Sequence, residues 1–397
     1  MKITQYLLLF LIACSFIMCK KVKHPKNIFI LKGSFTGKAA DTIFLTYRDS
    51  SGNRIEKSTA IIKGHFSFWD SINYPVHADL TSNIKTYPGS NDTVSNFAEV
   101  FLTPGEMTIE LRENDFDHAK ITGSPTQDEW NNLLKSYEPV NKIRDSLYDK
   151  MFGLERAGNT PKNHLAHEAI VRELDKYQLE IDKIDYNYII GHPKSYLSAY
   201  LLENFLGTDI RSDSIELFYK PFSDSVKKSM SGKIIEKEIL NRKESAVGSI
   251  VKMPSGTNAD GSRFDPRTIK INNYLLLYFW ASQANNNSRL KPVYDKYHTR
   301  GLDILAISID EPKRMWIDSI KNDHISMWHN ISSDPVDNLD TFYNIKQMAP
   351  SLLLLVDKNH RIVGRYRGDG VKWYKFDYRE GNLNDLEKKL AEIFEKN

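Results

Sequence analysis

The sequence predicts three folded regions: a small antiparallel β-sandwich-like domain, a helical connector and a C-terminal α/β domain. Three observations predict this order. Short segments with alternating apolar residues fill positions 27–123, helical apolar spacing fills 124–245, and continuous apolar runs alternate with helical spacing over 246–397. With 397 residues, 41% of them hydrophobic, the chain is long enough for two or three domains with buried cores.

The charge balance excludes one class of partner. The chain has 54 basic and 51 acidic side chains, a net charge of +3. Nucleic-acid binding usually needs a clustered basic face, so no nucleic-acid partner is expected. The sequence also contains no P-loop, no GxGxxG and no zinc-type CxxC pair. We therefore expect no cofactor.

The N-terminus, residues 1–19, has the features of an export signal. One lysine near the start is followed by an apolar run over residues 6–13, which is too short for a comfortable transmembrane helix. The run ends in LIAC, which resembles the lipobox of bacterial lipoproteins and makes Cys14 the expected lipidation site. Cys19, in FIMC, is the alternative, and a plain signal peptide is a further one. The basic run KKVK that follows is expected to be a solvated tether beside the membrane.

These two cysteines are the only ones in the chain. If Cys14 is acylated, its sulfur cannot pair with Cys19, and if Cys19 is the anchor, Cys14 is removed. In both cases the folded part has no disulfide and no thiol nucleophile. An exported protein of this kind must be stabilised by burial of its core.

Residues 27–123 carry strand patterns. ADTIFLTY and KGHFSFWDS alternate apolar and polar residues, and EVFLTPGEMTIELRE is expected to form a hairpin whose turn is Pro104-Gly105. Residues 124–245 are expected to be helical. SPTQ at 124–127 resembles a capping box, and one long helix carries an apolar stripe of Ile170, Leu174, Tyr177, Ile181, Ile184 and Tyr188. This stripe is short for a coiled coil, so a helix packed on its neighbours is favoured.

The α/β region contains two continuous apolar runs that predict buried central strands. They are NNYLLLYFW at 272–280 and LDILAISID at 302–310, separated by helical spacing over 288–300. A second helix is expected around 313–322. SLLLLVD and RIVGRYR predict a pair of strands across the turn at 357–360. The C-terminal helix presents Leu383, Leu386, Leu390 and Ile393 to the core.

Four pieces of this region carry a resemblance to a known family. They are YLLLYFWAS, the position of Pro292, GLDILAISID and the segment MAPS at 348–351. Together they resemble a thioredoxin-like domain of the TlpA type, in the thioredoxin and peroxiredoxin superfamily. The resemblance implies a thioredoxin fold with a cis-proline at Pro350. In the β region, LKGSFTGKAADTIFLTYRD and AIIKGHFSF resemble the sandwich domain of unknown function that often precedes such domains in envelope lipoproteins.

The family's redox motif is absent. After Trp-Ala-Ser the family has an aromatic residue and then Cys-x-x-Cys, whereas here Gln283 stands for the aromatic residue, Ala284 for the first cysteine and Asn287 for the second. Exchange chemistry needs a thiolate and a resolving thiol. Peroxidase chemistry likewise needs a cysteine in the first helical turn. No residue here is therefore predicted to be catalytic.

Two interpretations of the asparagines at 285–287 remain open. Asparagine is a strong N-cap residue, so capping of the helix and a polar turn is the simpler one. The other is a polar binding surface beside the expected cis-proline. The predicted binding residues are Trp280, Ser282, Gln283, Asn285, Asn286, Ala349 and Pro350. Trp280 is also expected to pack beside the turn.

Other candidate sites are weaker. His164 and His167 are three residues apart but lack a metal-binding motif, so no metal site is predicted. Asp310 is expected to end a strand. Arg361, Arg365 and Arg367 would share one strand face, which we interpret as a solvated basic edge.

The sequence therefore predicts a lipid-anchored protein of the bacterial cell envelope, facing the periplasm, with a redox-inactive thioredoxin-like domain. Its expected partner is an envelope protein or an extended peptide, and its N-terminal anchor would place it at a membrane. The rival is a thiol–disulfide oxidoreductase or peroxidase, as the family resemblance implies. A third possibility is that the last domain is only a structural cap.

Overall fold

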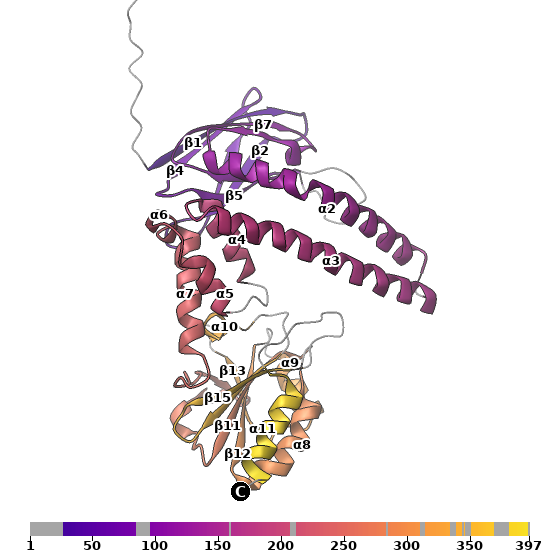
Figure 1. Cartoon of the computed structure of the whole chain (residues 1–397), viewed down its shortest axis with the longest axis vertical. Helices are drawn as coiled ribbons and strands as arrows, with labels where there is room; N and C mark the ends of the chain where they lie inside the picture. Colours follow the sequence, from indigo (N-terminus) through magenta and orange to yellow (C-terminus); the bar gives the residue numbers. More distant parts are fainter. Residues whose placement is uncertain are drawn as a thin grey trace, which may run out of the picture. The chain divides into compact units, whose positions relative to one another are not determined.

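The computed structural model describes residues 27–84, 96–158, 160–206, 212–282, 285–309, 314–333, 339–343, 345, 351–368 and 381–395. Two compact units make up the chain, residues 1–135 and 136–397 (Figure 1). No helix within the described ranges is both long enough and apolar enough to cross a membrane. Several residues singled out in the sequence lie outside these ranges: Cys14, Cys19, Gln283, Ala284, Asp310, Ala349 and Pro350.

The first unit is a β-sandwich of two four-stranded sheets, in the orders β4-β1-β7-β8 and β3-β2-β5-β6. Their strands are β1 (Ile28–Thr36), β2 (Thr42–Arg48), β3 (Arg54–Ala60), β4 (His65–Ser71), β5 (Val76–Ser82), β6 (Phe97–Leu102), β7 (Gly105–Arg112) and β8 (Lys120–Thr122), with a short helix η1 (Phe116–His118) before β8. One pair departs from the antiparallel expectation, since β1 and β7 run parallel. These two strands are distant in the chain. The hairpin predicted around Pro104-Gly105 is wrong, because β6 pairs with β5 in one sheet and β7 pairs with β1 in the other.

Alternating burial builds the sandwich core from both sheets. Phe29 and Leu31 of β1, Leu45 of β2 and Leu80 of β5 are all fully buried in one cluster. Gly33 makes room in this core, because a Cβ at that position would lie 2.0 Å from the Phe66 ring of the neighbouring strand. The pattern of the sequence and the burial in the structure agree here because alternation is a local property of a strand.

The predicted capping box at residues 124–127 forms only in part. Ser124 Oγ accepts a hydrogen bond from the backbone N–H of Gln127, at 3.2 Å. In a complete capping box the Gln127 side chain would accept from the Ser124 backbone N–H, but here it bonds to other groups. Its Oε1 accepts from the Phe101 backbone N–H at 2.8 Å, and its Nε2 donates to Asn131. A backbone group of the sandwich has therefore replaced the expected partner.

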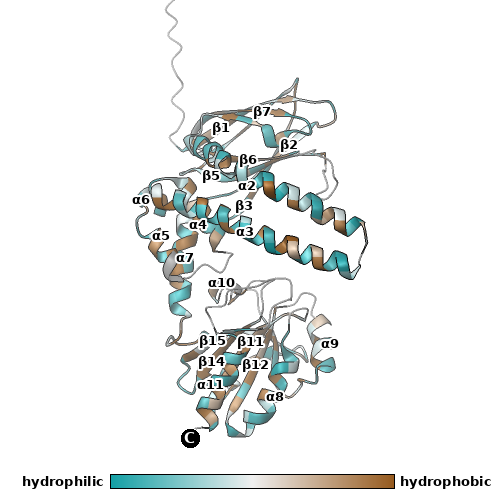
Figure 2. Ribbon diagram, turned by 45° about the vertical axis from the view of Figure 1, so that its right-hand side comes forward, coloured by the Kyte–Doolittle hydropathy of each residue, from teal (hydrophilic) through white to brown (hydrophobic). Residues whose placement is uncertain are grey.

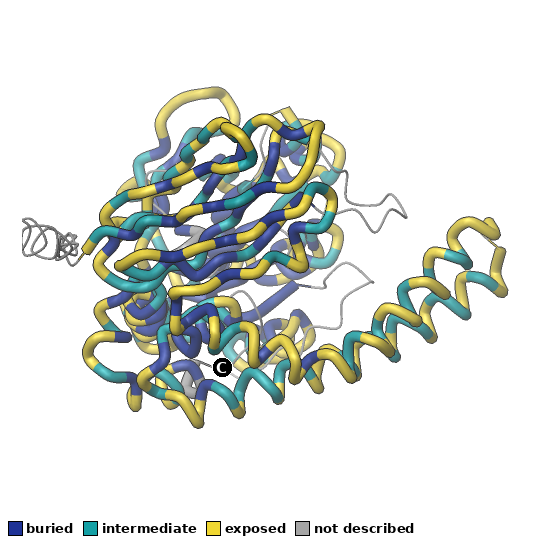
Figure 3. The backbone as a smooth tube through the Cα atoms, turned by 90° about the horizontal axis from the view of Figure 1, so that it is seen from above, coloured by how far each residue is buried: buried dark blue, intermediate teal, exposed yellow. Residues whose placement is uncertain are grey.

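Helices fill the middle of the chain: α2 (Pro125–Arg156), α3 (Pro161–Gly191), α4 (Tyr196–Phe205), α5 (Ser212–Tyr219), α6 (Asp224–Lys227) and α7 (Met230–Glu244). Helices α2 and α3 form an antiparallel hairpin. The Tyr137 hydroxyl bonds to Asp185 at one end, and His167 lies 3.6 Å from Glu155 at the other. Between positions 138 and 188 no described residue is buried, as the exposed and intermediate colours of Figure 3 show.

The C-terminal part holds a seven-stranded sheet in the order β10-β9-β13-β12-β11-β14-β15. The strands are β9 (Gly256–Asn258), β10 (Arg263–Phe264), β11 (Tyr274–Trp280), β12 (Leu302–Ser308), β13 (His329–Ser333), β14 (Leu352–Asp357) and β15 (Ile362–Arg367). The helices are η2 (Pro266–Thr268), α8 (Asn287–Tyr297), η4 (His298–Arg300), α9 (Arg314–Asn322), α10 (Leu339–Phe342) and α11 (Leu383–Glu395).

The central topology is that of a thioredoxin-like fold. Strand β11, helix α8 and strand β12 form a parallel crossover unit, and β14, β15 and α11 form an antiparallel hairpin followed by a helix. The hairpin joins the crossover through the antiparallel pair β11–β14. The predicted α/β fold, including its strand pair and terminal helix, is confirmed.

Both faces of β11 are buried, which explains its continuous apolar run. Leu276, Tyr278 and Trp280 belong to the core under α8, α9 and α11, whereas Leu275 and Leu277 belong to the core on the opposite face. Figure 2 shows the strands largely in hydrophobic colours, with alternating colours on α8 and α11. Such a strand must be apolar at every position.

The arginines near β15 do not form the predicted solvated edge. Arg365 is half-buried and donates to the carbonyl oxygens of Tyr343 and Ser245, and Arg367 is buried. Arg361 precedes the strand and donates to the Gly248 carbonyl at 2.9 Å. The prediction is wrong for Arg365 and Arg367, which are withdrawn from solvent, whereas Arg361 is exposed. Backbone carbonyls of the segment after α7 accept from Arg361 and Arg365, and the Tyr343 carbonyl accepts from Arg365 as well.

Candidate functional site

The candidate site is the turn between β11 and α8, where the sequence places its three asparagines. Strand β11 ends at Trp280, and α8 begins at Asn287 after Asn286 as its N-cap residue. Trp280 is 1% exposed and packs against Tyr278, 6.1 Å between ring centroids. The structure therefore places this predicted binding residue in the core, where a partner could not reach it.

Asn285 closes the turn on its surface side. Its Oδ1 accepts from the Asn287 backbone N–H at 3.2 Å, and its Nδ2 donates to the Ser282 carbonyl at 2.9 Å. Both Ser282 and Asn285 are half-buried. These two residues thus belong to one side of the turn and retain some contact with solvent.

Asn286 is the centre of a buried polar network. Its backbone N–H donates to the Tyr278 hydroxyl at 2.6 Å, and its Nδ2 donates to Ser351 Oγ at 3.1 Å. Burial raises the pKa of the Tyr278 hydroxyl, an effect opposed by its bonds with Asn286 and Ser351. The network joins the end of β11, the start of α8 and the residue before β14.

Gly368 completes the same network from the end of β15. Its N–H donates to the Ser351 carbonyl at 2.7 Å. A Cβ at this position would lie 2.2 Å from Asn286 Nδ2, so any larger residue would displace the asparagine side chain. The close packing of the Asn286 side chain on the Gly368 backbone therefore favours glycine here.

Asn287 has a different role from its two neighbours. It is fully buried, and its Nδ2 donates to Asp323 Oδ2, 2.7 Å away, just after the end of α9. Among the described residues its Oδ1 has no partner. Of the three asparagines, only Asn285 bonds a backbone N–H at the helix start through its side chain, so the capping interpretation is correct for one residue.

Four residues of this site were not predicted from the sequence: Tyr278, Asp323, Ser351 and Gly368. Tyr278 is a polar group inside an apolar run, which is a usable signal. Ser351 belongs to the segment MAPS, to which the family resemblance already pointed, whereas Asp323 and Gly368 come from distant parts of the chain and carry no signal of their own. The structure brings Ser282, Asn285 and Asn286 together; the remaining predicted residues, Gln283, Ala349 and Pro350, lie outside the described ranges.

The described part of the site offers amides and hydroxyls but no thiol. Both cysteines of the chain precede residue 20. Thiol–disulfide exchange needs a thiolate nucleophile. The arrangement can hold a turn rigidly and can present polar groups at the start of α8.

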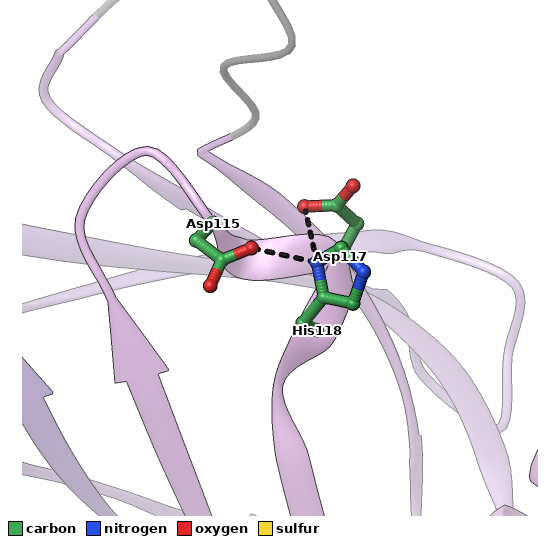
Figure 4. A group of neighbouring side chains, drawn as sticks. All are labelled: Asp115, Asp117 and His118. Atoms are coloured by element: carbon green, nitrogen blue, oxygen red, sulfur yellow. Dashed lines mark hydrogen bonds and ion pairs between the residues drawn. The ribbon is translucent and has the colours of Figure 1, made fainter.

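Neither group of potential metal ligands makes a convincing metal site. His164 lies 3.6 Å from Glu168, and His167 pairs with Glu155 on the other helix of the hairpin, so the two histidines have separate partners. In the first unit, the Nδ1 atom of His118 lies 2.6 Å from Oδ1 of Asp115 and 3.8 Å from Oδ1 of Asp117 (Figure 4). This cluster, Asp115, Asp117 and His118, is largely exposed, and its members already bond to one another.

The fold and site define a β-sandwich followed by helices and a thioredoxin-like domain. Residues 29–130 match the family described as a domain of unknown function (DUF4369). No curated protein matches the chain.

The solved structures that resemble the C-terminal part include thioredoxin-like domains of thiol-disulfide oxidoreductases from Bacteroides. One is the thioredoxin domain of a thiol-disulfide oxidoreductase from Bacteroides vulgatus, 21% identical, covering 38% of this chain and 98% of that chain, TM-score 0.30. A thiol:disulfide interchange protein from Bacteroides sp. is 21% identical, and the match covers 38% of this chain and 91% of that chain with a TM-score of 0.30. A thiol-disulfide oxidoreductase from Bacteroides fragilis is 24% identical, and the match covers 37% of this chain and 99% of that chain with a TM-score of 0.28.

Proposed function

We propose that this chain is a lipid-anchored envelope protein whose thioredoxin-like domain binds an extended segment of a partner protein and does not catalyse thiol–disulfide exchange. The observation that carries the proposal is the buried network of Tyr278, Asn286 and Ser351. It fixes the turn at which the family resemblance places the redox motif, using amides and hydroxyls in place of thiols.

The loss of redox chemistry follows from the residues at the two motif positions. Ala284 has no nucleophilic atom. Asn287 has an amide in place of a resolving thiol, and that amide is buried against Asp323. A fold supplies no nucleophile by itself, so activity must be argued from the site. The site supports binding better than exchange.

The proposed binding mode uses the backbone beside Pro350. An extended segment can add strand-like hydrogen bonds to an exposed backbone edge, and neighbouring side chains then select its sequence. Ser282 and Asn285 are half-buried and lie on the same turn as Asn286. They would supply side-chain contacts next to the predicted segment Ala349–Pro350. The lipid anchor, at Cys14 or Cys19, would hold the domain at an envelope membrane facing the periplasm.

Site-specific photo-crosslinking tests the binding surface. A photoreactive amino acid would replace Ser282, and the matched control would replace Lys358, which is exposed in the turn at the opposite end of β11 and β14. In envelope extract we expect one crosslinked protein from position 282 and none from position 358. Pro350→Ala should weaken that product while circular dichroism stays unchanged. Equal crosslinking from both positions would refute the proposed surface.

An insulin-reduction assay and a peroxide assay test the redox rival. The protein would begin at Lys26, which removes both cysteines. We expect turnover no higher than that of buffer alone. Turnover that persists in this form and falls on mutation of Asn287 would establish an enzyme in place of a binding module.

A further inference from the structure

Trp69 is a large aromatic side chain left open on the outer face of the sandwich. It lies on β4 and is 67% exposed. Its cross-strand partner on the same face is Ile30 of β1, and Ile28 follows two residues away on that strand. We call Ile28, Ile30 and Trp69 the Trp69 face. Both isoleucines are only half-buried, so this end of the sheet presents apolar surface to its surroundings.

The charges beside the Trp69 face are already paired. Lys32 bonds to Glu106, and the Lys57 amine lies 2.6 Å from an Asp70 carboxylate oxygen. The same amine donates to the Trp69 carbonyl at 3.2 Å and lies 5.9 Å from the centre of its ring. Paired charges lower the cost of bringing a surface to a region of low polarity. An indole suits such a boundary because it combines an apolar body with one N–H donor.

The chain order places this face next to the proposed anchor. Strand β1 begins at Ile28, so eight residues separate it from Cys19 and thirteen from Cys14. At about 3.5 Å per extended residue, these segments reach at most roughly 30 and 50 Å. The intervening sequence KKVKHPK, residues 20–26, contains four lysines and one histidine. Such a segment is attracted to anionic headgroups, at about 1 kcal/mol for each lysine near the surface.

We propose that the Trp69 face rests on the lipid surface, with the indole of Trp69 at the level of the headgroups. The proposal rests on the lipid anchor proposed above. Tryptophan is enriched at membrane–water boundaries for the physical reasons given. The anchor and the basic segment bring the sandwich to the bilayer, and the Trp69 face then fixes which side of the sandwich meets it.

Fluorescence quenching by brominated lipids tests this orientation. The full lipidated protein would be reconstituted in vesicles of phosphatidylethanolamine with a minor fraction of phosphatidylglycerol, some of it brominated near the headgroup end of the acyl chains. Trp69→Phe keeps an aromatic residue at an exposed position, and Trp130→Phe is the matched control. Trp130 packs against Phe101, 5.9 Å between ring centroids.

We expect the quenched part of the fluorescence to fall by roughly half or more in Trp69→Phe, because an indole at the headgroups lies within reach of the bromines. Trp130→Phe should retain it. Equal quenching in Trp69→Phe and wild type, with both proteins floating with the vesicles, would overturn the orientation and assign the face to water or to a protein. Failure of the wild type to float would overturn the anchor itself, and the proposal with it.

Discussion

The three consecutive asparagines show how one residue type takes three roles within one turn. Asn285 closes the turn, Asn286 joins it to Ser351, and Asn287 is buried against Asp323. The sequence predicted a polar turn with caps, which describes only the first. The partners of the other two are 65 and 36 residues away in the chain, and local patterns carry no information about them.

Asn287→Asp should make stability depend on pH. The substitution places a second carboxylate where an amide now donates to Asp323 at 2.7 Å. Two carboxylates at this distance cannot both ionise, so the folded pair has a raised pKa. The folded state then holds a proton that the unfolded chain releases, and stability falls as the pH rises through that raised pKa. Urea unfolding near pH 5 and near pH 8 should differ by about 2 kcal/mol more than in wild type.

Asn287→Ala is the control for that change. It removes the donor to Asp323 without adding charge, so it should cost about 1–3 kcal/mol at both pH values. If the free energy of unfolding depends on pH in the same way in Asn287→Asp and Asn287→Ala, Asp323 does not lie close to residue 287 in solution.

At the scale of elements, sequence predicted best what depends on local burial. The continuous apolar run of β11 and the alternation of β2 and β4 could be predicted because the spacing of apolar residues in a strand follows which of its faces are buried. The partners of Gln127 and Arg365 could not be predicted in this way, because both side chains bond to backbone groups elsewhere in the chain. The parallel pair β1–β7 was also missed, since strand pairing leaves no mark in either strand.

Tyr343→Phe should loosen the attachment of the segment before β9. The Tyr343 hydroxyl accepts from the Lys252 backbone N–H and donates to the Lys252 carbonyl, each at 2.8 Å. Tyr343 is fully buried, so removal of its hydroxyl takes away both of these bonds inside the core. We expect a loss of about 1–3 kcal/mol in urea unfolding.

Tyr294→Phe is the comparison for that loss. The Tyr294 ring is buried, but its hydroxyl makes only long bonds of 3.5 Å, to His298 and to the Met327 carbonyl. We expect less than about 1 kcal/mol from this change. Similar losses in both variants would mean that the bonds to Lys252 contribute little.

The α2–α3 hairpin should lose stability as the pH rises from acid to neutral. Burial raises the pKa of Asp185 to about 6, although its bond with the Tyr137 hydroxyl acts in the opposite direction. Because the folded pKa exceeds the unfolded one, the folded state binds the proton more tightly. This contribution is complete below about pH 4 and is lost as the pH rises through about 6. For this partly exposed group we expect on the order of 1 kcal/mol.

Two variants separate Asp185 from other titrating groups. Asp185→Asn should flatten this part of the pH profile in thermal unfolding. Tyr137→Phe removes the bond that lowers the Asp185 pKa, so the loss of stability should move to higher pH. If the pH dependence of thermal unfolding is unchanged in Asp185→Asn, another group is responsible for it.

At the scale of the molecule, the sequence predicted a helical region and a thioredoxin-like domain as separate stretches. The structure places the helical region from Ser136 onward and the thioredoxin-like domain in one compact unit, residues 136–397. The segment that joins them is bonded to β15 by Gly248 N–H to the Ile362 carbonyl at 2.7 Å and by Ile362 N–H to the Ser249 carbonyl at 2.9 Å. Nothing in the composition of this segment distinguishes it from an ordinary loop.

Arg365→Ala should release this joining segment. The guanidinium binds the carbonyls of Ser245 and Tyr343 together, so it ties the end of α7 to the sheet at one point. Without it, the backbone N–H groups of Gly248 and Val251 should exchange with solvent roughly tenfold faster or more, because their bonds to the Ile362 and His360 carbonyls open locally. Lys358→Ala, at an exposed turn of the same sheet, should leave the exchange unchanged.

The pattern of exchange distinguishes a local tie from general stability. Faster exchange confined to the joining segment, with the β11 amides still protected, would show that Arg365 couples the helical region to the thioredoxin-like domain. Faster exchange in β11 as well would mean that the guanidinium stabilises the whole unit, because global opening exposes every amide alike. Arg365→Lys should resemble Arg365→Ala, since one ammonium lacks the planar fork that reaches both carbonyl oxygens.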